Sequence, residues 1–200
     1  MPFSTFAENY QLDQWSTNHG GFMSAHSAYS ATGANELSGG SYARVAVTWS
    51  AASAGVKSLS GTPYTINCPA SSTVAFIGFW DASSSGNFQG MSPNAAGASP
   101  FAFAAPSSTS ILLAPGSAYA NNQTVVVFAT GGATLPSGLT AGTVYFARSP
   151  SSDSFQLATT SGGTPITLSG DGSGYVQAIN VETFSGAGSL SVTSGSMTLI

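Results

Sequence analysis

The sequence predicts a mainly β protein, with a β-sandwich-like domain that carries one N-terminal helix and a second, smaller β-module. Short segments alternate apolar and polar residues, and a period of two places successive side chains on opposite faces of a strand. Turns rich in Gly, Ser and Pro separate these segments. In the second half of the chain the segments recur about every ten residues, a spacing typical of all-β modules.

The composition narrows the classes of function. The chain has 200 residues, of which 5% are charged and 42% are hydrophobic, and its formal net charge is −4. It has no Lys or Arg cluster, which disfavours nucleic-acid binding because that binding depends on neutralising phosphates. An apolar run of about 18 residues and a basic leader are both missing, so we expect neither a membrane span nor a signal peptide. The single cysteine excludes an internal disulfide and indicates a reducing cytosol.

Residues 2–16 are the best helix candidate. One face of this helix, at positions i, i+3, i+4 and i+7, carries Phe3, Phe6, Ala7 and Tyr10. The pair Gly20-Gly21 then breaks the pattern, and the signals that follow are those of strands.

Four segments of the first half are predicted strands: 21–27, 42–50, 62–69 and 73–80. In the second of them, alternation puts Val45, Val47 and Trp49 on one side of the strand. The last of them, TVAFIGFW, is almost continuously apolar, which predicts a central, buried strand.

A Gly-, Ala- and Pro-rich stretch, residues 94–108, is predicted to be a linker or edge structure. Beyond it, four more strands are expected with turns between them: 124–128, 143–147, 154–158 and 164–168. Their spacing predicts a compact β-module of roughly fifty to sixty residues. The chain then alternates through residues 180–200, and we expect this end to be a paired strand.

Residues 31–53, ATGANELSGGSYARVAVTWSAAS, resemble a signature of accessory virion proteins of tailed phages, often called tail-fibre or minor structural proteins. The aromatic stretch Ile77-Gly78-Phe79-Trp80-Asp81 and the terminal SLSVTSGSMTLI fit the same family. The resemblance covers residues 1–114 and 178–200. It implies an N-terminal helix that leads into strands, and a structural role in the virion.

Residues 124–176 are similar to a small β-repeat found in phage tail and capsid-associated proteins. Its hallmarks in this chain are Leu135-Pro136, Gly138-Leu139, Gly142-Thr143, Tyr145, Asp153, Phe155, Gly163 and Pro165-Ile166. With this second resemblance we expect a virion-attachment domain of residues 1–114 and 178–200, into which a β-module of residues 115–177 is inserted. The terminal strand would then return to the sheet of the first domain. Simple tandem domains are the alternative.

Two opposite charges flank a glycine turn in the first domain. Glu36 and Arg44 bracket Gly39 and Gly40, and glycine supplies the positive φ that such a turn needs. We expect Glu36 and Arg44 to form a structural pair that fixes the register of the following strand, because a slip of one residue would invert every side chain. A subunit contact is the alternative role for Arg44, and a catalytic role is disfavoured.

The remaining polar residues do not predict a catalytic or metal centre. His19, His26 and Cys68 are the only His and Cys side chains, too few and too dispersed for a zinc site. The seven carboxylates are mostly isolated in turns, which disfavours paired-carboxylate chemistry. We therefore expect a protein that is not an enzyme and holds no cofactor or metal. A depolymerase is the enzyme alternative.

Aromatic residues are the other candidates for a site. Phe101 and Phe103 lie in the linker-like stretch with no obvious core to join, so we expect them at an interface between subunits. The aromatic residues of the first-half strands are expected in the core, with a sugar-stacking platform as the alternative: Trp49, Phe76, Phe79 and Trp80.

These observations favour a phage virion protein, made in the cytoplasm of the bacterial host, that works by assembly. A capsid-surface decoration or minor capsid protein is preferred, because the chain is short and has no repetitive shaft. The alternatives are a minor tail or tail-fibre protein that contacts the host, and a glycan-binding module. Expected partners are major capsid or tail proteins and further copies of the chain, with a trimer among the options. A host-surface glycan is an additional candidate, whereas nucleic acid and membrane are not expected.

Overall fold

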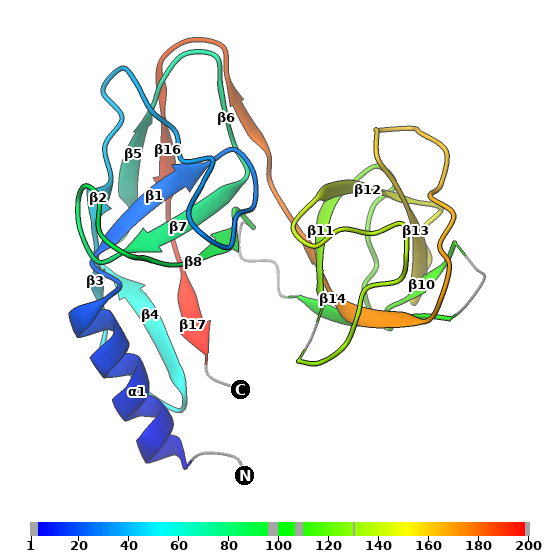
Figure 1. Cartoon of the computed structure of the whole chain (residues 1–200), viewed down its shortest axis with the longest axis horizontal. Coiled ribbons are helices and arrows are strands. Elements are labelled where there is room, and N and C mark those ends of the chain that lie inside the picture. Colours follow the sequence, from blue (N-terminus) through cyan, green and yellow to red (C-terminus); the bar gives the residue numbers. More distant parts are fainter. Residues whose placement is uncertain (1–3, 96–99, 107–109, 130, 199–200) are drawn as a thin grey trace. The chain divides into compact units, whose positions relative to one another are not determined.

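The computed structural model describes residues 4–95, 100–106, 110–129 and 131–198, and the chain divides into two units. The first unit comprises Met1–Ser92 and Glu182–Ile200, and the second comprises Pro93–Val181. Figure 1 shows the helix and many strands in the first unit, and a barrel in the second. The predicted class, mainly β with one N-terminal helix and a smaller β-module, is confirmed.

The described part of the first unit contains the elements α1 (Thr5–Asn18), β1 (Phe22–His26), β2 (Val45–Ala46), β3 (Thr48–Trp49), β4 (Val56–Ser60), β5 (Tyr64–Cys68), β6 (Ser72–Val74), β7 (Phe76–Trp80), β8 (Phe88–Pro93), β15 (Glu182–Phe184), β16 (Gly188–Val192) and β17 (Ser196–Thr198). One sheet has the order β2-β1-β7-β8, and another has the order β17-β4-β3. The remaining strands form the pairs β15-β6 and β16-β5.

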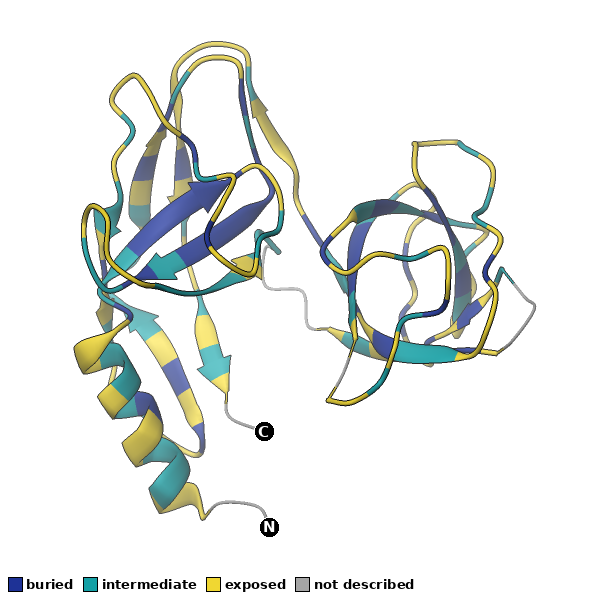
Figure 2. Ribbon diagram, viewed as in Figure 1, coloured by how far each residue is buried: buried dark blue, intermediate teal, exposed yellow. Residues whose placement is uncertain are grey.

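Strands β1 and β7 form the centre of the first unit. They are antiparallel over their full length, with Phe22 opposite Trp80 and His26 opposite Phe76. Both strands are mostly buried, as Figure 2 shows, which confirms the buried strand predicted within residues 73–80. That segment is divided at Ala75, because the residues before it pair with β15 and those after it pair with β1.

The alternation in residues 42–50 correctly predicts which side chains face the core, but it wrongly predicts one continuous strand. Val47 is buried, Val45 and Trp49 pack against the same core, and Ala46 is exposed. Two short strands, β2 and β3, replace the single one expected. Between them the Val47 N–H donates to the carbonyl of Gly21 (2.9 Å), in the register of the β1–β2 pair, whereas Thr48 and Trp49 pair with β4.

The two segments of the first unit that flank the insertion form one long antiparallel ribbon. Strand β5 pairs with β16 and β6 pairs with β15 in a single register that runs from Tyr64 opposite Val192 to Val74 opposite Glu182. Pairing is interrupted at residues 69–71 and 185–187, between the two halves. Residues 182–192 are therefore an integral part of the first unit's fold.

Helix α1 is confirmed, but its predicted packing face is wrong. The hydroxyl of Ser4 accepts the N–H of Ala7 (3.3 Å) and caps the helix start. Phe6 and Tyr10 are 82% and 59% exposed, whereas Leu12 is buried. Phe3, also placed on that face, lies outside the described residues.

The contacts of α1 explain which side faces the strands. Trp15 packs edge-on against Trp49 and Phe79, with centroid distances of 5.6 Å and 6.3 Å. The Asp13 carboxylate pairs with Lys57 of β4. These contacts lie on the Leu12 side of the helix and leave Phe6 and Tyr10 pointing away.

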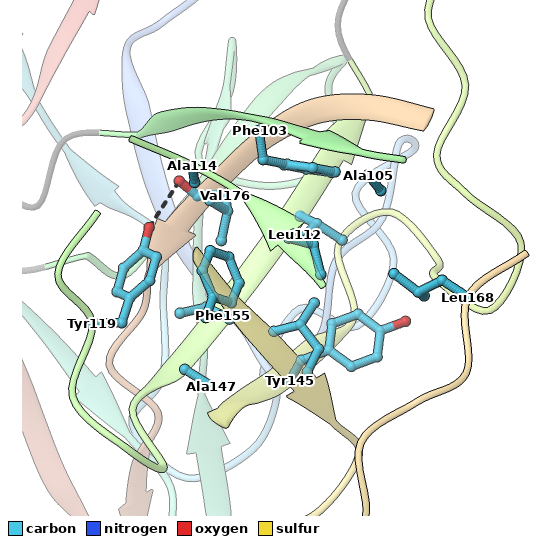
Figure 3. Close-up of a cluster of buried hydrophobic side chains, with 13 residues drawn as sticks. Phe103, Ala105, Leu112, Ala114, Tyr119, Tyr145, Ala147, Phe155, Leu168 and Val176 are labelled. Carbon is cyan, nitrogen blue, oxygen red and sulfur yellow. Dashed lines mark hydrogen bonds between the residues drawn. The ribbon is translucent and has the colours of Figure 1, made fainter. Parts of the chain in front are cut away.

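The second unit is a closed antiparallel barrel with the strand order β10-β13-β12-β11-β14-β9. Its strands are β9 (Phe101–Ala105), β10 (Leu112–Leu113), β11 (Thr124–Ala129), β12 (Val144–Arg148), β13 (Ser154–Ala158) and β14 (Gly172–Ala178). Alternate residues fill the interior, among them Phe103, Phe155 and Val176 (Figure 3). The hydroxyl of Tyr119 donates to the carbonyl of Val176 (3.2 Å) at the edge of this core.

The barrel corrects two expectations from the sequence. Residues 101–105, expected within a linker or edge structure, are strand β9, which pairs with both β10 and β14. Residues 164–168, expected as a strand, are not one. There the N–H of Ile166 donates to the carbonyl of Leu157 (2.7 Å), and Leu168 is buried. The apolar residues of this segment therefore pack against the core, although the segment does not form a strand.

The second unit extends beyond the expected module of residues 115–177 at both ends, since it includes β9 and residues up to Val181. Asn94 and Asn180 lie where the chain enters and leaves the second unit, and two hydrogen bonds join them. The N–H of Asn180 donates to the carbonyl of Asn94 (2.6 Å), and the Asn94 amide donates to the carbonyl of Asn180 (3.3 Å).

Candidate functional site

The residues singled out around the glycine turn meet in a polar cluster of the first unit. Arg44 donates to Glu36 through Nε (2.9 Å to Oε1) and Nη2 (2.8 Å to Oε2), a two-pronged pair. The side chain of Arg44 is 9% exposed and that of Glu36 is 19% exposed. The pair is therefore largely removed from water.

Arg44 also binds the loop that follows β7. Its guanidinium carbon lies 3.5 Å from the centroid of the Trp80 ring, a cation–π contact. Its Nη1 donates to the carbonyls of Ala82 (3.1 Å) and Ser85 (2.6 Å). One side chain thus joins Glu36, the aromatic stretch and the loop after it.

The glycine turn brings Tyr42 into the same cluster. Gly39 and Gly40 have φ values of 93° and 58°, and the N–H of Tyr42 donates to the carbonyl of Gly39 (3.2 Å). The Tyr42 hydroxyl donates to Glu36 Oε1 (2.9 Å) and accepts the N–H of Ala25 (3.1 Å). Glycine at both positions makes this tight turn feasible without a Cβ clash.

The charges of the cluster are set by these contacts. Burial acts to raise the pKa of Glu36, but the hydrogen bonds from Arg44 and Tyr42 outweigh it and lower that pKa below its ordinary value. Burial raises the pKa of Tyr42. Glu36 is accordingly ionised and Tyr42 neutral at neutral pH.

A second buried group, around His26, lies beside this cluster. His26 Nδ1 is 2.9 Å from the carbonyl of Ala34, and Nε2 is 2.7 Å from Ser24 Oγ. Trp80 Nε1 donates to Ser24 Oγ (2.9 Å). Because a carbonyl only accepts, Nδ1 carries the hydrogen, and Nε2 accepts the Ser24 hydroxyl. Burial lowers the pKa of His26 and keeps the ring neutral.

The Ser24–His26 contact does not form a nucleophilic site. Both side chains are completely buried, so a substrate has no access to the hydroxyl. The histidine is oriented by a backbone carbonyl, and a catalytic pair would have a carboxylate or equivalent in that place. The arrangement satisfies buried polar groups and is structural.

Gly78, in the middle of the aromatic stretch, makes room for this group. A Cβ at this position would lie 2.4 Å from His26 Nε2 and 2.6 Å from Ser24 Oγ. Position 78 therefore accepts glycine alone while His26 and Ser24 keep their places.

Cys68 is a buried side chain whose thiol pKa is raised by burial, which makes it unreactive. Among the described residues, His, Cys, Asp and Glu side chains form no group of three or more that could hold a metal ion. In the same part of the chain, no helix has both the length and the apolar character to cross a membrane.

The structure places Phe101 and Phe103, which were expected at an interface between subunits, in strand β9 of the barrel. Phe103 is 4% exposed and belongs to the barrel core, while Phe101 packs against that core and lies edge-on to Tyr119 at 6.1 Å. The side chain of Phe103 is thus used within the barrel core, and that of Phe101 is partly covered by it. The segment does have a core to join, because β9 closes the barrel.

The aromatic residues of the first-half strands also pack inward. Trp80 is 9% exposed beneath Arg44, and Phe76 is fully buried. Trp49 is half-buried, contacts Trp15 and Phe79, and donates through Nε1 to the carbonyl of Gly20 (2.8 Å). This packing favours the core assignment over a sugar-stacking platform.

One ion pair that involves a buried lysine was missed at the level of sequence. The only lysine of the chain, Lys57, has a side chain 4% exposed and pairs with Asp13. Asp13 Oδ1 also accepts the N–H of Ala52 (2.9 Å), and its hydrogen bond with Lys57 lowers the pKa of Asp13. A lone lysine within an alternating segment, VKSLS, is the signal that could have revealed it.

In the comparison with known proteins, the part of the chain that contains this cluster matches a protein family. Residues 16–98 match the family model of the Podophage GP4 fiber I protein gp80. The match includes Glu36, Arg44 and the aromatic stretch Ile77–Asp81, and ends before β9. Neither the curated proteins nor the solved structures provide a match. The first unit is therefore similar to a structural protein of a phage fibre.

Proposed function

We propose that this chain is a structural component of a phage tail fibre. The observation that carries the proposal is the match of residues 16–98 to a fibre protein, since these residues build most of the first unit. This supports the minor tail or tail-fibre alternative over the capsid-surface decoration that we preferred from chain length.

The geometry of the first unit supports a role in assembly without catalysis. The charged and polar groups of its buried cluster, including Glu36, Arg44 and His26, are engaged with the chain itself. Such a cluster fixes a turn and a loop in place. The hydrogen bonds and charges of this cluster support the proposal that the first unit is a rigid module for attachment to other virion proteins.

The partners in this proposal are other virion proteins, and the site of action is the virion. The barrel adds a surface with exposed apolar side chains, among them Leu113 (45% exposed) and Tyr175 (38% exposed). Exposed apolar side chains of this kind support contact with another molecule. In the proposal the barrel is the unit that makes a second contact, while the first unit holds the fibre together.

Labelling of the protein in purified virions tests the proposal. A peptide tag in the exposed loop around Gly131 and Gly132, detected by gold-labelled antibody in electron micrographs, should mark the tail appendages. Labels spread over the capsid would support the decoration alternative instead. Absence of the protein from purified particles would overturn both, and release of sugar from host envelopes by the purified chain would support the depolymerase alternative.

A further inference from the structure

Arg148, at the end of β12, is the one arginine or lysine of the barrel unit. The other two cations of the chain, in the first unit, each pair with a carboxylate. Arg148 has no such partner within the described residues and instead donates through Nη1 to Oδ1 of Asn122 (2.8 Å). Its positive charge is therefore not neutralised by the part of the chain that the structure describes.

One edge of the Arg148 guanidinium, formed by Nε and Nη2, is left unused. Nε is buried and has no hydrogen-bond partner, which is unfavourable for a donor removed from water. Arg44 shows what this edge can do, because its Nε and Nη2 donate to the two carboxylate oxygens of Glu36. Arg148 is partly exposed, so a ligand can approach Nη2 first and reach Nε after a small movement of the atoms that cover it.

Gln156 of β13 lies beside Arg148 on the outer surface of the barrel. The two residues are directly opposite each other in the antiparallel pair, which places their Cβ atoms about 4.5 to 5.5 Å apart. Both point away from the core, because the residues before and after them along the strands, Ala147, Phe155 and Leu157, belong to that core. The half-buried Gln156 side chain thus holds an amide donor close to an anion bound by Arg148.

The other groups near Arg148 are neutral and polar. Oδ1 of Asn122 also accepts the N–H of Gly162 (2.8 Å), and Oδ1 of Asn121 accepts the N–H of Ser149 (3.3 Å). Asn121, Asn122 and Ser149 are exposed, so their remaining amide and hydroxyl donors face solvent. One cation surrounded by amides and a hydroxyl matches a ligand that combines an anionic group with several hydroxyl groups.

We propose that Arg148 binds the carboxylate of a sugar acid, with Nε and Nη2 each donating to one oxygen. The planar fork of the guanidinium fits a carboxylate, and the side chains of Gln156, Asn121 and Ser149 supply hydrogen bonds to the sugar hydroxyls. This inference depends on the barrel alone and not on the proposed fibre function.

The charge of the barrel favours a carboxylate over a phosphate. Residues 93–181 contain one arginine and two aspartates, a formal net charge of −1. Asp153 is exposed in the turn between β12 and β13, and its pKa is lowered by hydrogen bonds from Ser152 and Gly116, so it is ionised at neutral pH. A phosphate dianion would be repelled more strongly by these carboxylates than a single negative charge.

Titration of the ¹⁵N-labelled full chain with D-glucuronate tests the site by NMR. The chain has two arginines, so the two Nε–H signals report on Arg148 and Arg44 separately. The Arg148 signal should shift and saturate, while that of Arg44, already bonded to Glu36, should stay in place. Glucose, which lacks the carboxylate, should move neither signal. Acetate should bind about tenfold more weakly than glucuronate, because it lacks the hydroxyl groups.

Two substitutions separate the roles of charge and fork. Arg148→Lys keeps the charge and removes the two-pronged edge, so glucuronate affinity, followed through the backbone signal of Gly162, should fall about tenfold or more. Gln156→Ala leaves the bond between Arg148 and Asn122 intact and should also weaken binding. Gln11→Ala, at an exposed glutamine of α1, is the matched control and should leave the affinity unchanged. Circular dichroism should show that all three variants are folded.

An Arg148 signal that does not respond to glucuronate in the folded protein would overturn the proposal. Equal shifts of the Arg148 and Arg44 signals would do so too, because they would indicate a non-specific effect of the anion. Equal affinities for glucuronate, acetate and inorganic phosphate, or tighter binding of a glutamate tripeptide, would exclude a sugar acid as the ligand. None of these results bears on the fibre proposal, which labelling of virions tests separately.

Discussion

The guanidinium carbon of Arg44 lies over the Trp80 ring, 3.5 Å from its centroid, while the guanidinium nitrogens donate to the carboxylate of Glu36. The charge of Arg44 is therefore shielded by an aromatic face and neutralised by a carboxylate. The fork of the guanidinium fits the two carboxylate oxygens, and its positive charge is attracted to the face of the aromatic ring. We therefore expect the geometry of the pair, as well as its charge, to contribute to stability.

Removal of Glu36 should destabilise the first unit strongly. Glu36→Ala leaves Arg44 largely buried with an unpaired charge, which should lower the free energy of unfolding by about 3 kcal/mol. Urea unfolding followed by tryptophan fluorescence measures this loss. The matched control is Glu182→Ala at an exposed carboxylate, where a change within about 0.5 kcal/mol is expected. Equal losses in both variants would contradict a structural role for the pair.

Acid should destabilise the first unit through His26. The unfolded chain binds this proton with an ordinary pKa of 6.5, whereas burial lowers the pKa in the folded protein. The unfolded state therefore binds more protons below pH 6.5, and stability decreases as the pH falls, by at most about 1.4 kcal/mol per pH unit. Glu36 adds a further loss at lower pH, because its folded pKa is also lowered from 4.5.

Substitution of His26 should remove the first part of this pH dependence. In His26→Gln the slope of unfolding free energy between about pH 5 and 6.5 should flatten, although the variant is less stable at pH 7. His19→Gln, the same substitution at an exposed position, is the matched control. A slope that survives in His26→Gln would assign the acid sensitivity to another group.

Gly78→Ala should disrupt the His26 group by steric conflict. The added methyl would lie 2.4 Å from His26 Nε2, so His26 or β7 must move. We expect a loss of about 1 to 3 kcal/mol, as for other overpacked cores, seen as a lower melting temperature. Gly186→Ala, where no atom lies within 4 Å of the new methyl, should leave the melting temperature nearly unchanged.

Phe103→Ala should destabilise the barrel and spare the first unit. Removal of a core phenylalanine should cost about 3 to 5 kcal/mol within its own core. All three tryptophans, Trp15, Trp49 and Trp80, belong to the first unit, so their fluorescence reports that unit alone. The circular dichroism transition should shift while the fluorescence transition stays in place. A joint shift would show that the two units unfold together.

The alternation of apolar and polar residues correctly predicted strands in which buried and exposed side chains alternate in the same way. In Tyr64–Cys68, Ile66 and Cys68 are buried and Thr65 and Asn67 are exposed, as a period of two requires. The segment Phe101–Ala105 alternates equally well, but its Gly, Ala and Pro neighbours suggested a linker. Its role becomes clear only from pairing with β14, whose residues lie about seventy positions later.

The packing side of α1 and the His26 group depend on distant partners. The aromatic residues Phe6 and Tyr10 suggested one face of the helix, whereas Lys57 and Trp49 select the other. Ser24 and Trp80 are 56 positions apart in the chain and form a direct hydrogen bond. The Glu36–Arg44 contact was accessible from sequence because a short glycine turn separates the two charges.

The ribbon between residues 64–74 and 182–192 has a consequence for synthesis on the ribosome. Residues 1–92 emerge first, yet the strands that complete their sheets emerge only after the whole of residues 93–181 has been made. Within the described residues the strands of the barrel pair only with one another, so the pairing of the barrel does not depend on residues 182–192. Strands β5 and β6 therefore keep an unpaired edge until residues 182–192 emerge, and neighbouring nascent chains can associate through that edge in the interval.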